Sequence, residues 1–261
     1  MGKLEEIIIS KMNEIRELKA ADSICSAAER YEGPSFLHSL KDSTSLAVIA
    51  EVKMKSPSQG IMSRGADHLE IARIFDEAGV NAISVLTDKK FFDGSFNILR
   101  NISRFVKSPL LCKDFILDRV QIDMALWNGA SAVLLITEIL DDGKLADLYG
   151  YALKLGLDVL VEAHFPENIK RAIDLKASII GINNRDLDTL EENPDNALLL
   201  SKLIPEGIVK LSLSSCKNRS DALRLARAGL DGVLIGGALM KSNDWRQAIM
   251  QFLNIPRLKN D

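Results

Sequence analysis

Short apolar runs rich in β-branched residues recur along the chain about every 20 to 35 residues, and amphipathic stretches with helical periodicity fill the gaps. Eight such runs predict strands, over residues 46–53, 82–86, 110–113, 132–136, 158–162, 179–183, 209–213 and 232–235. Eight consecutive strand–helix units are typical of a closed barrel. The sequence therefore predicts the α/β class and a single (β/α)8 TIM barrel.

Helix boundary signals agree with this pattern. Two of the gaps open on an Asp followed three residues later by Glu or Gln, at Asp67 and Asp118, and close on Gly79 and Gly129. An open doubly wound sheet is the competing architecture. It usually has a Gly-rich turn after its first strand, where this chain has Lys-Ser-Pro-Ser at 55–58, so the closed barrel is favoured.

The chain shows no linker or compositional break, and we expect one domain over residues 1–261. Residues 46–261 form the predicted barrel. Residues 1–45 form an N-terminal helical extension that begins with a helix over about residues 4–18. Such an extension can close the bottom of a barrel or reach over its mouth, and the sequence leaves both open.

Composition excludes several classes of protein. An apolar fraction of 47% and a charged fraction of 26% suit a folded chain with a large core. The net charge is −3 with no block of like charge, so neither a nucleic-acid partner nor a membrane partner is expected. Cys25, Cys112 and Cys216 are widely spaced, and the N-terminus lacks a signal peptide. Both features predict a cytoplasmic protein with reduced thiols.

Polar residues follow the apolar part of four predicted strands. Barrels of this kind assemble their active sites at the carboxyl ends of the strands. The first strand leads to an acid and a lysine on the same face, the third to a lysine, the fifth to an acid, and the sixth to an amide and a guanidinium: Glu51, Lys53, Lys113, Glu162, Asn183 and Arg185. Structural ion pairs at the rim are the alternative, but separate pairs have no reason to share one end of the barrel.

The last two predicted strands pass into small residues, Ser-Ser-Cys after Leu213 and Gly-Gly-Ala after Ile235. Small residues let backbone N–H groups approach an anion, and many barrels bind phosphate at these two strands. Plain turns are the alternative. The position of the glycines after the last strand favours a phosphate site.

Several segments together carry a resemblance to a known family, at residues 49–58, 84–88, 91–95, 113–115, 132–136, 160–162, 181–187 and 234–237. In these segments the chain resembles the indole-3-glycerol phosphate synthase family of tryptophan biosynthesis. The resemblance implies a carboxy-lyase acting on 1-(o-carboxyphenylamino)-1-deoxyribulose 5-phosphate. The substrate closes a ring, loses carbon dioxide and then loses water, with no metal or organic cofactor.

The resemblance also implies roles for the strand-end residues. Lys113 would protonate the ketose carbonyl, with its pKa lowered by burial and by the neighbouring Lys53. Glu162 would act as a general base or stabilise developing positive charge, and Glu51 with Lys53 would share the remaining acid and base work. Asn183 belongs to the same catalytic set.

Further residues are expected to bind the substrate. The protein itself is expected to be a monomer or a weak oligomer. Arg185, together with Asn183, would hold the anthranilate carboxylate and a sugar hydroxyl. Four apolar residues would wall the aromatic ring, although core packing is the alternative for each: Phe92, Phe115, Leu134 and Leu187. The phosphate would be received by Ser56, Ser214, Ser215, Gly236 and Gly237.

One position departs from the family pattern. The family has Glu-Ser-Gly at the end of the seventh strand, and this chain has Leu213-Ser214-Ser215. A pocket carboxylate is therefore missing, and a side chain replaces glycine beside the phosphate. Three interpretations stay open: an enzyme that works without this carboxylate, a barrel with a changed substrate, or a binding or interaction protein that has lost catalysis.

Two other phosphosugar barrels fit less well. Phosphoribosylanthranilate isomerase would have a cysteine base at the end of the first strand, where this chain has Glu51 and Lys53. A Schiff-base aldolase could use Lys53 or Lys113 as its nucleophile. Neither Asn183 nor Arg185 is explained by that chemistry.

Overall fold

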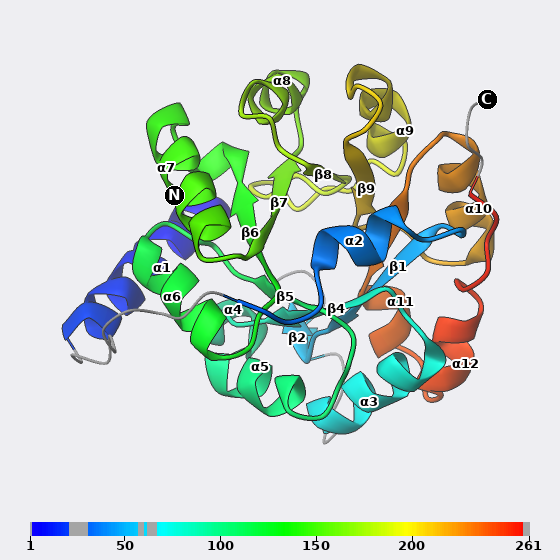
Figure 1. Ribbon diagram of the computed structural model, residues 1–261, viewed down its shortest axis with the longest axis horizontal. Helices are drawn as coiled ribbons and strands as arrows, with labels where there is room; N and C mark the ends of the chain where they lie inside the picture. The colour runs from blue at the N-terminus through cyan, green and yellow to red at the C-terminus, as the bar shows by residue number, and fades with distance from the viewer. Residues whose placement is uncertain (1, 21–30, 57–59, 62–66, 258–261) are drawn as a thin grey trace.

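The computed structural model describes residues 2–20, 31–56, 60–61 and 67–257. Eight parallel strands form a closed barrel in the order β1-β10-β9-β8-β7-β6-β5-β4, with helices around it (Figure 1). The strands are β1 (Ala47–Val52), β4 (Ala82–Leu86), β5 (Leu110–Lys113), β6 (Ala132–Ile136), β7 (Asp158–Ala163), β8 (Ile179–Asn183), β9 (Val209–Leu213) and β10 (Gly232–Ile235). The predicted (β/α)8 barrel is confirmed, and each predicted strand end is correct to within one residue.

Helices connect successive barrel strands, and two more follow the last strand. They are α3 (His68–Ala78), α4 (Lys89–Phe92), α5 (Phe96–Ser103), α6 (Arg119–Trp127), α7 (Asp142–Lys154), α8 (Pro166–Asp174), α9 (Asn196–Leu200), α10 (Arg219–Arg227), α11 (Gly237–Met240) and α12 (Trp245–Met250), with 3-10 turns η1 (Thr137–Ile139) and η2 (Ser201–Leu203). A small hairpin pairs β2 (Lys55–Ser56) with β3 (Gly60–Ile61). None of the helices described is both long and apolar enough to cross a membrane.

The predicted caps set the boundaries of α3 and the start of α6, whereas α6 ends on Asn128, one residue before the predicted Gly129. The Asp67 side chain accepts a hydrogen bond from Leu69 N, and α3 ends at Gly79 with a left-handed φ of 82°. Asp118 forms a reciprocal capping box with Gln121 at the start of α6. These bonds satisfy backbone groups that the first and last turns of a helix leave without a partner.

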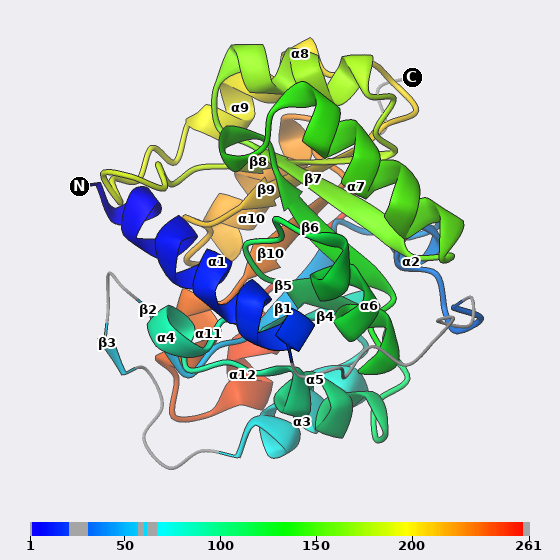
Figure 2. The same cartoon turned by 90° about the vertical axis from the view of Figure 1, so that its left-hand side faces the viewer.

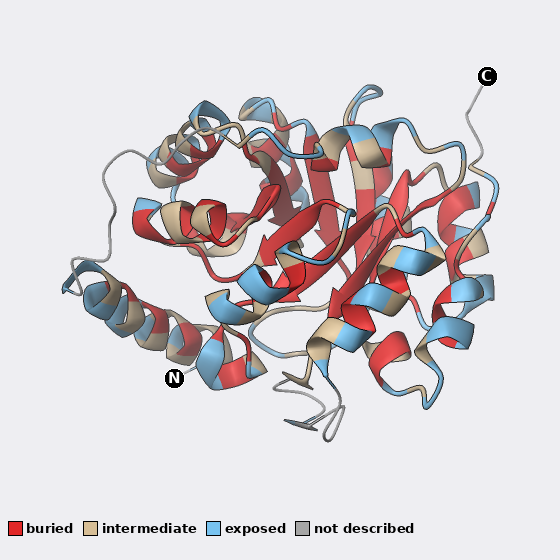
Figure 3. Cartoon of the chain, turned by 60° about the horizontal axis from the view of Figure 1, so that its bottom comes forward, coloured by how far each residue is buried: buried red, intermediate tan, exposed pale blue. Residues whose placement is uncertain are grey.

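Side chains alternate between the barrel interior and the helix layer along each strand. In β1, Ala47 and Ile49 belong to the interior cluster, and Val48 and Ala50 belong to the cluster beneath the helices. Both faces are therefore buried, as the red strands of Figure 3 show. Glu51 is the next inward residue after Ile49, so the same alternation places its carboxylate at the carboxyl end of the barrel.

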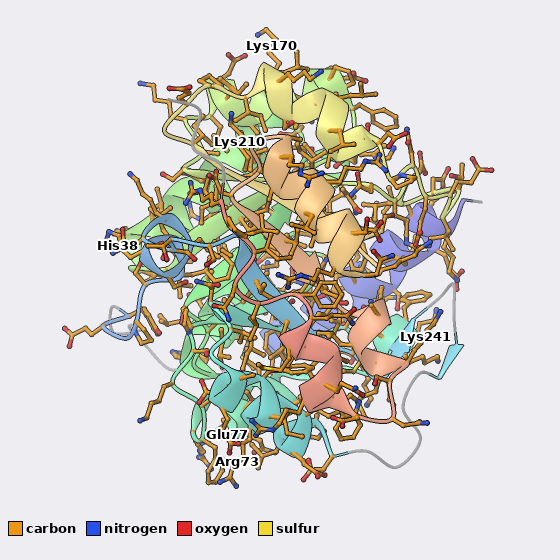
Figure 4. All side chains as sticks on the ribbon, turned by 90° about the vertical axis from the view of Figure 1, so that its right-hand side faces the viewer. His38, Arg73, Glu77, Lys170, Lys210 and Lys241 are labelled. Atoms are coloured by element: carbon orange, nitrogen blue, oxygen red, sulfur yellow. The ribbon has the colours of Figure 1, made fainter. Side chains whose placement is uncertain are left out.

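Helix α2 (Phe36–Lys41) closes the bottom of the barrel. Phe36 and Leu40 are fully buried in the interior cluster. Leu37 N and the Ser35 hydroxyl, just before the helix, both donate to Asp158, the first residue of β7. Figure 4 shows His38 of α2 on the side opposite Lys241, which follows α11 at the mouth.

Helix α1 (Lys3–Ala20) lies at the other end of the barrel, across the ends of the strands (Figure 2). Ile7 faces the cavity at the mouth and is only 3% exposed. The N-terminal extension thus does both things that the sequence left open: α2 closes the bottom, and α1 covers part of the mouth.

Candidate active site

A cavity of about 380 Å³ lies at the carboxyl ends of the barrel strands. Its wall combines charged strand-end residues, apolar side chains and the small residues after β9 and β10. All six charged and amide residues predicted from the strand ends line it: Glu51, Lys53, Lys113, Glu162, Asn183 and Arg185. The structure therefore brings these six residues together around one cavity, and their roles as an active site stay a prediction.

Glu51 and Lys53 form one acid–lysine pair. Glu51 Oε1 lies 2.5 Å from Lys53 Nζ, and Glu51 is 3% exposed. Burial alone would raise the pKa of the Glu51 carboxyl, but the ammonium groups of Lys53 and Lys113 outweigh burial and lower that pKa. Glu51 is therefore a buried carboxylate that stays ionised at neutral pH.

Lys113 and Glu162 form a second pair across the cavity. Lys113 Nζ lies 3.5 Å from Glu162 Oε2, and Asn183 Nδ2 donates to Glu162 Oε1 at 2.8 Å. Asn183 Oδ1 in turn accepts from Arg185 N at 3.0 Å. The amide of Asn183 thus orients the Glu162 carboxylate and leaves its second oxygen directed toward Lys113.

The expected lowering of the Lys113 pKa is wrong. Burial does favour the neutral amine, but the carboxylates of Glu162 and Glu51 outweigh it and raise the pKa. Lys53, the residue expected to lower this pKa, is paired with Glu51. Lys113 is therefore an ammonium at neutral pH, able to donate a proton or to stabilise a negative oxygen.

Arg185 lines the cavity, and its guanidinium has two hydrogen-bond partners in the loop after β8. It donates to Leu190 O at 2.9 Å and to the Glu192 carboxylate, and Glu192 also pairs with Lys217 at 3.2 Å. Burial opposes ionisation of Glu192, but Arg185 and Lys217 lower its pKa. A guanidinium has five donors, so Arg185 can bind a substrate carboxylate while Glu192 holds it.

Small residues after β9 and β10 form another part of the cavity lining. Gly236 and Gly237 line it, and a Cβ on Gly236 would lie 2.2 Å from Glu51 Oε1. Ser214 and Ser215 also line it and have left-handed φ values of 65° and 62°. The four predicted phosphate-binding residues of these turns are therefore brought together next to the acid–lysine pairs.

Ser215 carries strain that glycine would relieve. Its φ is unfavourable for a residue with a Cβ, and its Oγ is buried without a hydrogen-bond partner of good geometry among the described residues. We expect Ser215→Gly to raise the free energy of unfolding by about 1 kcal/mol, measured by urea denaturation. Ser214→Gly should gain less because the Ser214 hydroxyl is not buried without a partner. A lower urea midpoint for Ser215→Gly would contradict the strain argument.

Apolar side chains also line the cavity. The Phe92 and Phe115 ring centroids are 6.2 Å apart at an interplanar angle of 37°. Leu134 and Leu187 line the same cavity. Phe115 and Leu134 are also buried in the barrel interior, so for these two residues packing and ring contact are compatible.

Leu213 adds apolar surface where the family pattern has glutamate. It lines the cavity, is 1% exposed and packs over Gly181, where an added Cβ would lie 2.7 Å from Leu213 Cδ1. The acids that line the described cavity come from β1, β7 and the segments after β5 and β8 instead. They are Glu51, Glu162, Asp114 and Glu192.

Some site residues were missed or cannot be placed. Ser56 lies in β2, but its side chain is outside the described part of the structure. Sequence reasoning missed Ile7, Glu192, Lys217 and Lys241, which all line the cavity. Ile7 belongs to the buried stripe of α1, a signal that the sequence contains. The other three lie in loops or at a helix end, where no strand-end pattern marks them. No cluster of metal-ligating side chains occurs in the described ranges.

Comparison with known proteins identifies the family of this chain. The family model for indole-3-glycerol phosphate synthase matches residues 4–252. The chain belongs to the indole-3-glycerol phosphate synthase family. Indole-3-glycerol phosphate synthase from Exiguobacterium sibiricum is 43% identical over 244 residues, which cover 94% of each chain. The enzyme of the same name from Leptospira interrogans is 42% identical over 245 residues, again 94% of each chain.

The family assignment covers both the barrel and α1, because the matched range begins within that helix. Solved structures show the same fold at low identity. Thiamine phosphate pyrophosphorylase from Pyrococcus furiosus aligns with a TM-score of 0.58 at 18% identity, over 80% of this chain and 93% of that one. Orotidine 5'-phosphate decarboxylase from Pyrococcus horikoshii aligns at 0.59 with 14% identity, over 77% and 94%. These two likenesses concern the fold alone.

Proposed function

We propose that this chain converts 1-(o-carboxyphenylamino)-1-deoxyribulose 5-phosphate into indole-3-glycerol phosphate, carbon dioxide and water. The observation that carries the proposal is the one cavity whose lining combines two acid–lysine pairs, apolar side chains and two turns of small residues. A substrate with an aromatic acid at one end and a phosphate at the other matches that arrangement. Family membership over residues 4–252 supports the same reaction.

Lys113 is the proposed general acid for ring closure. As the ring carbon that bears the carboxylate attacks the ketose carbonyl, the carbonyl oxygen gains negative charge and takes a proton from the Lys113 ammonium. Glu162 lies 3.5 Å from that ammonium and is oriented by Asn183. Its charge stabilises the positive charge that develops on the substrate nitrogen before carbon dioxide leaves.

Glu51 and Lys53 are the proposed second pair for the proton transfers that remain. Loss of water requires a proton for the leaving hydroxyl and a base for the proton that the ring gives up. An ionised carboxylate and an ammonium 2.5 Å apart offer both. We assign the pair to these transfers without dividing the two roles between its members.

The remaining residues bind the substrate. Arg185 is the proposed partner of the anthranilate carboxylate, because a guanidinium makes paired hydrogen bonds to a planar acid. The four aromatic and leucine side chains of the wall contact the ring, and the turns at Ser214–Ser215 and Gly236–Gly237 receive the phosphate. Ser56 is retained as a further phosphate residue from the family resemblance.

A barrel with a changed substrate or lost catalysis is the alternative, because of Leu213. The comparisons do not favour it, since relatives 38–43% identical over most of the chain are indole-3-glycerol phosphate synthases. Cytoplasmic location, a monomeric or weakly oligomeric state and the lack of a nucleic-acid partner stay predictions. The test is a continuous assay of indole fluorescence with the proposed substrate. Turnover by the purified chain is the expected result, and no turnover would refute the proposal.

Glu192 should influence substrate affinity through Arg185. It faces Arg185 across an isolated antiparallel bridge and fixes one edge of the guanidinium. We expect Glu192→Ala to raise KM about fivefold with kcat within about twofold, because ordering a freed side chain costs about 1 kcal/mol. The measurement is steady-state kinetics by indole fluorescence.

Glu191→Ala is the matched control for this variant, because Glu191 is the exposed neighbour of Glu192 in the same loop. Its KM should equal that of the parent. A KM for Glu192→Ala below the parent value would show instead that Glu192 competes with the substrate for Arg185.

A further inference from the structure

Lys11 is an unusual residue for a helix at the protein surface. The buried stripe of α1 consists of Ile7, Lys11 and Ile15, and Lys11 is 0% exposed. A buried ammonium is unfavourable unless carboxylates surround it. The buried side chains around Lys11 are therefore expected to include carboxylates.

Three carboxylates meet the Lys11 ammonium. Lys11 Nζ lies 2.8 Å from Asp114 Oδ1, 3.0 Å from Asp88 Oδ2 and 2.7 Å from Glu14 Oε2. Asp88 and Asp114 are themselves buried, at 1% and 2% exposure. Burial opposes the charge on Lys11, but the carboxylates outweigh it and raise the pKa, so the ammonium persists.

Asp114 ties this cluster to the end of β5. It directly follows Lys113, its Oδ1 accepts from Phe115 N at 2.7 Å, and its Oδ2 accepts from the Thr87 hydroxyl at 2.7 Å. The carboxylate that Lys11 binds therefore fixes the backbone on which Lys113 and Phe115 stand.

Asp88 ties the same ammonium to α4. It is the N-cap of that helix, and its Oδ1 accepts from Phe91 N at 2.8 Å. Phe92, which faces Phe115 in the cavity, is the last residue of α4. One side chain of α1 thus joins the two segments that carry the proposed acid and both aromatic rings of the wall.

We propose that Lys11 is a positioning residue for the reaction, which through Asp114 and Asp88 holds Lys113, Phe115 and Phe92 in their places around the substrate. The inference rests on the proposed function for the roles of these three residues. It makes α1 part of the catalytic unit, although Lys11 does not contact the substrate itself.

The variant Lys11→Met removes the charge and keeps most of the side-chain length. We expect kcat to fall at least about tenfold and KM to rise about threefold, because small displacements of reacting groups are costly in rate. Kinetics are measured at a temperature where circular dichroism shows that the variant is folded. A loss of folded molecules alone would lower apparent kcat and leave KM unchanged.

Lys19→Met is the matched control. Lys19 also anchors α1 to the barrel through a carboxylate, Asp118, at 2.7 Å, but Asp118 caps α6 and carries no site residue. Both kinetic constants of this variant should stay within about twofold of the parent. Equal losses in the two variants would overturn the proposal, because docking of α1 by any anchor would then explain them. A Lys11→Met variant with parental constants would overturn it as well.

Amide hydrogen exchange tests the same inference without turnover. Phe91 N–H and Phe115 N–H donate to the two carboxylates that Lys11 binds. Both should exchange about tenfold faster in Lys11→Met than in the parent or in Lys19→Met. Unchanged exchange would overturn the proposal. If the parent does not convert the substrate, the proposed function fails, and the exchange result still decides whether Lys11 orders these segments.

Discussion

Lys113→Met is expected to lower kcat about a thousandfold, in the range that general acid catalysis usually contributes. The ammonium is the group that meets the developing negative charge on the ketose oxygen, and its raised pKa keeps it protonated at neutral pH. Methionine keeps most of the side-chain volume but offers no proton and no charge. The measurement is steady-state kinetics by indole fluorescence, with KM expected to change much less than kcat.

Lys90→Met is the control for this substitution. Lys90 lies on α4 at the same end of the barrel, more than half exposed, and pairs only weakly with Glu6 at 3.7 Å. Its kinetic constants should match the parent. If Lys113→Met kept kcat within about tenfold of the parent, another group would have to be the acid, and the assignment of Lys113 would be withdrawn.

The barrel could be predicted from the sequence because its signals are local. The apolar runs are continuous, since parallel strands are buried on both faces, and Gly79 and Asp118 mark helix boundaries within a few residues of the chain. Strand-end residues such as Glu51 and Glu162 follow from the same pattern. A strand's inward positions and its last residue together place a side chain at the mouth.

The remaining parts of the site depend on contacts between distant segments. Lys11 pairs with Asp114, which is about a hundred residues away in the sequence. The sequence around Lys11 contains no pattern that predicts a helix lying over the barrel mouth. Glu192 becomes a site residue only because its loop turns back to Arg185. The pKa of Lys113 was predicted with the wrong sign because two carboxylates from other strands outweigh burial. These two contacts and the direction of the pKa shift depend on which segments the fold brings together.

Leu213→Glu is expected to raise kcat about a hundredfold, since one well-placed electrostatic group commonly contributes two to three powers of ten. Leu213 lines the same cavity as Lys53 and Lys113, so a carboxylate there would add negative charge beside the cationic intermediate. The gain should come with a loss of about 2 kcal/mol in the free energy of unfolding, because a polar group replaces a leucine that is 1% exposed. Indole fluorescence and urea denaturation measure the two effects.

Leu213→Gln separates the charge from the change of shape. Glutamine has nearly the volume of glutamate and should destabilise the barrel to a similar degree, because it too would lie over Gly181 in place of leucine. Without a negative charge it should give no increase in kcat. Equal rates for the glutamate and glutamine variants would mean that the other cavity carboxylates already supply the stabilisation that this strand lacks. In that case the carboxylates of Glu51 and Glu162, each held opposite a lysine, would be sufficient for the reaction.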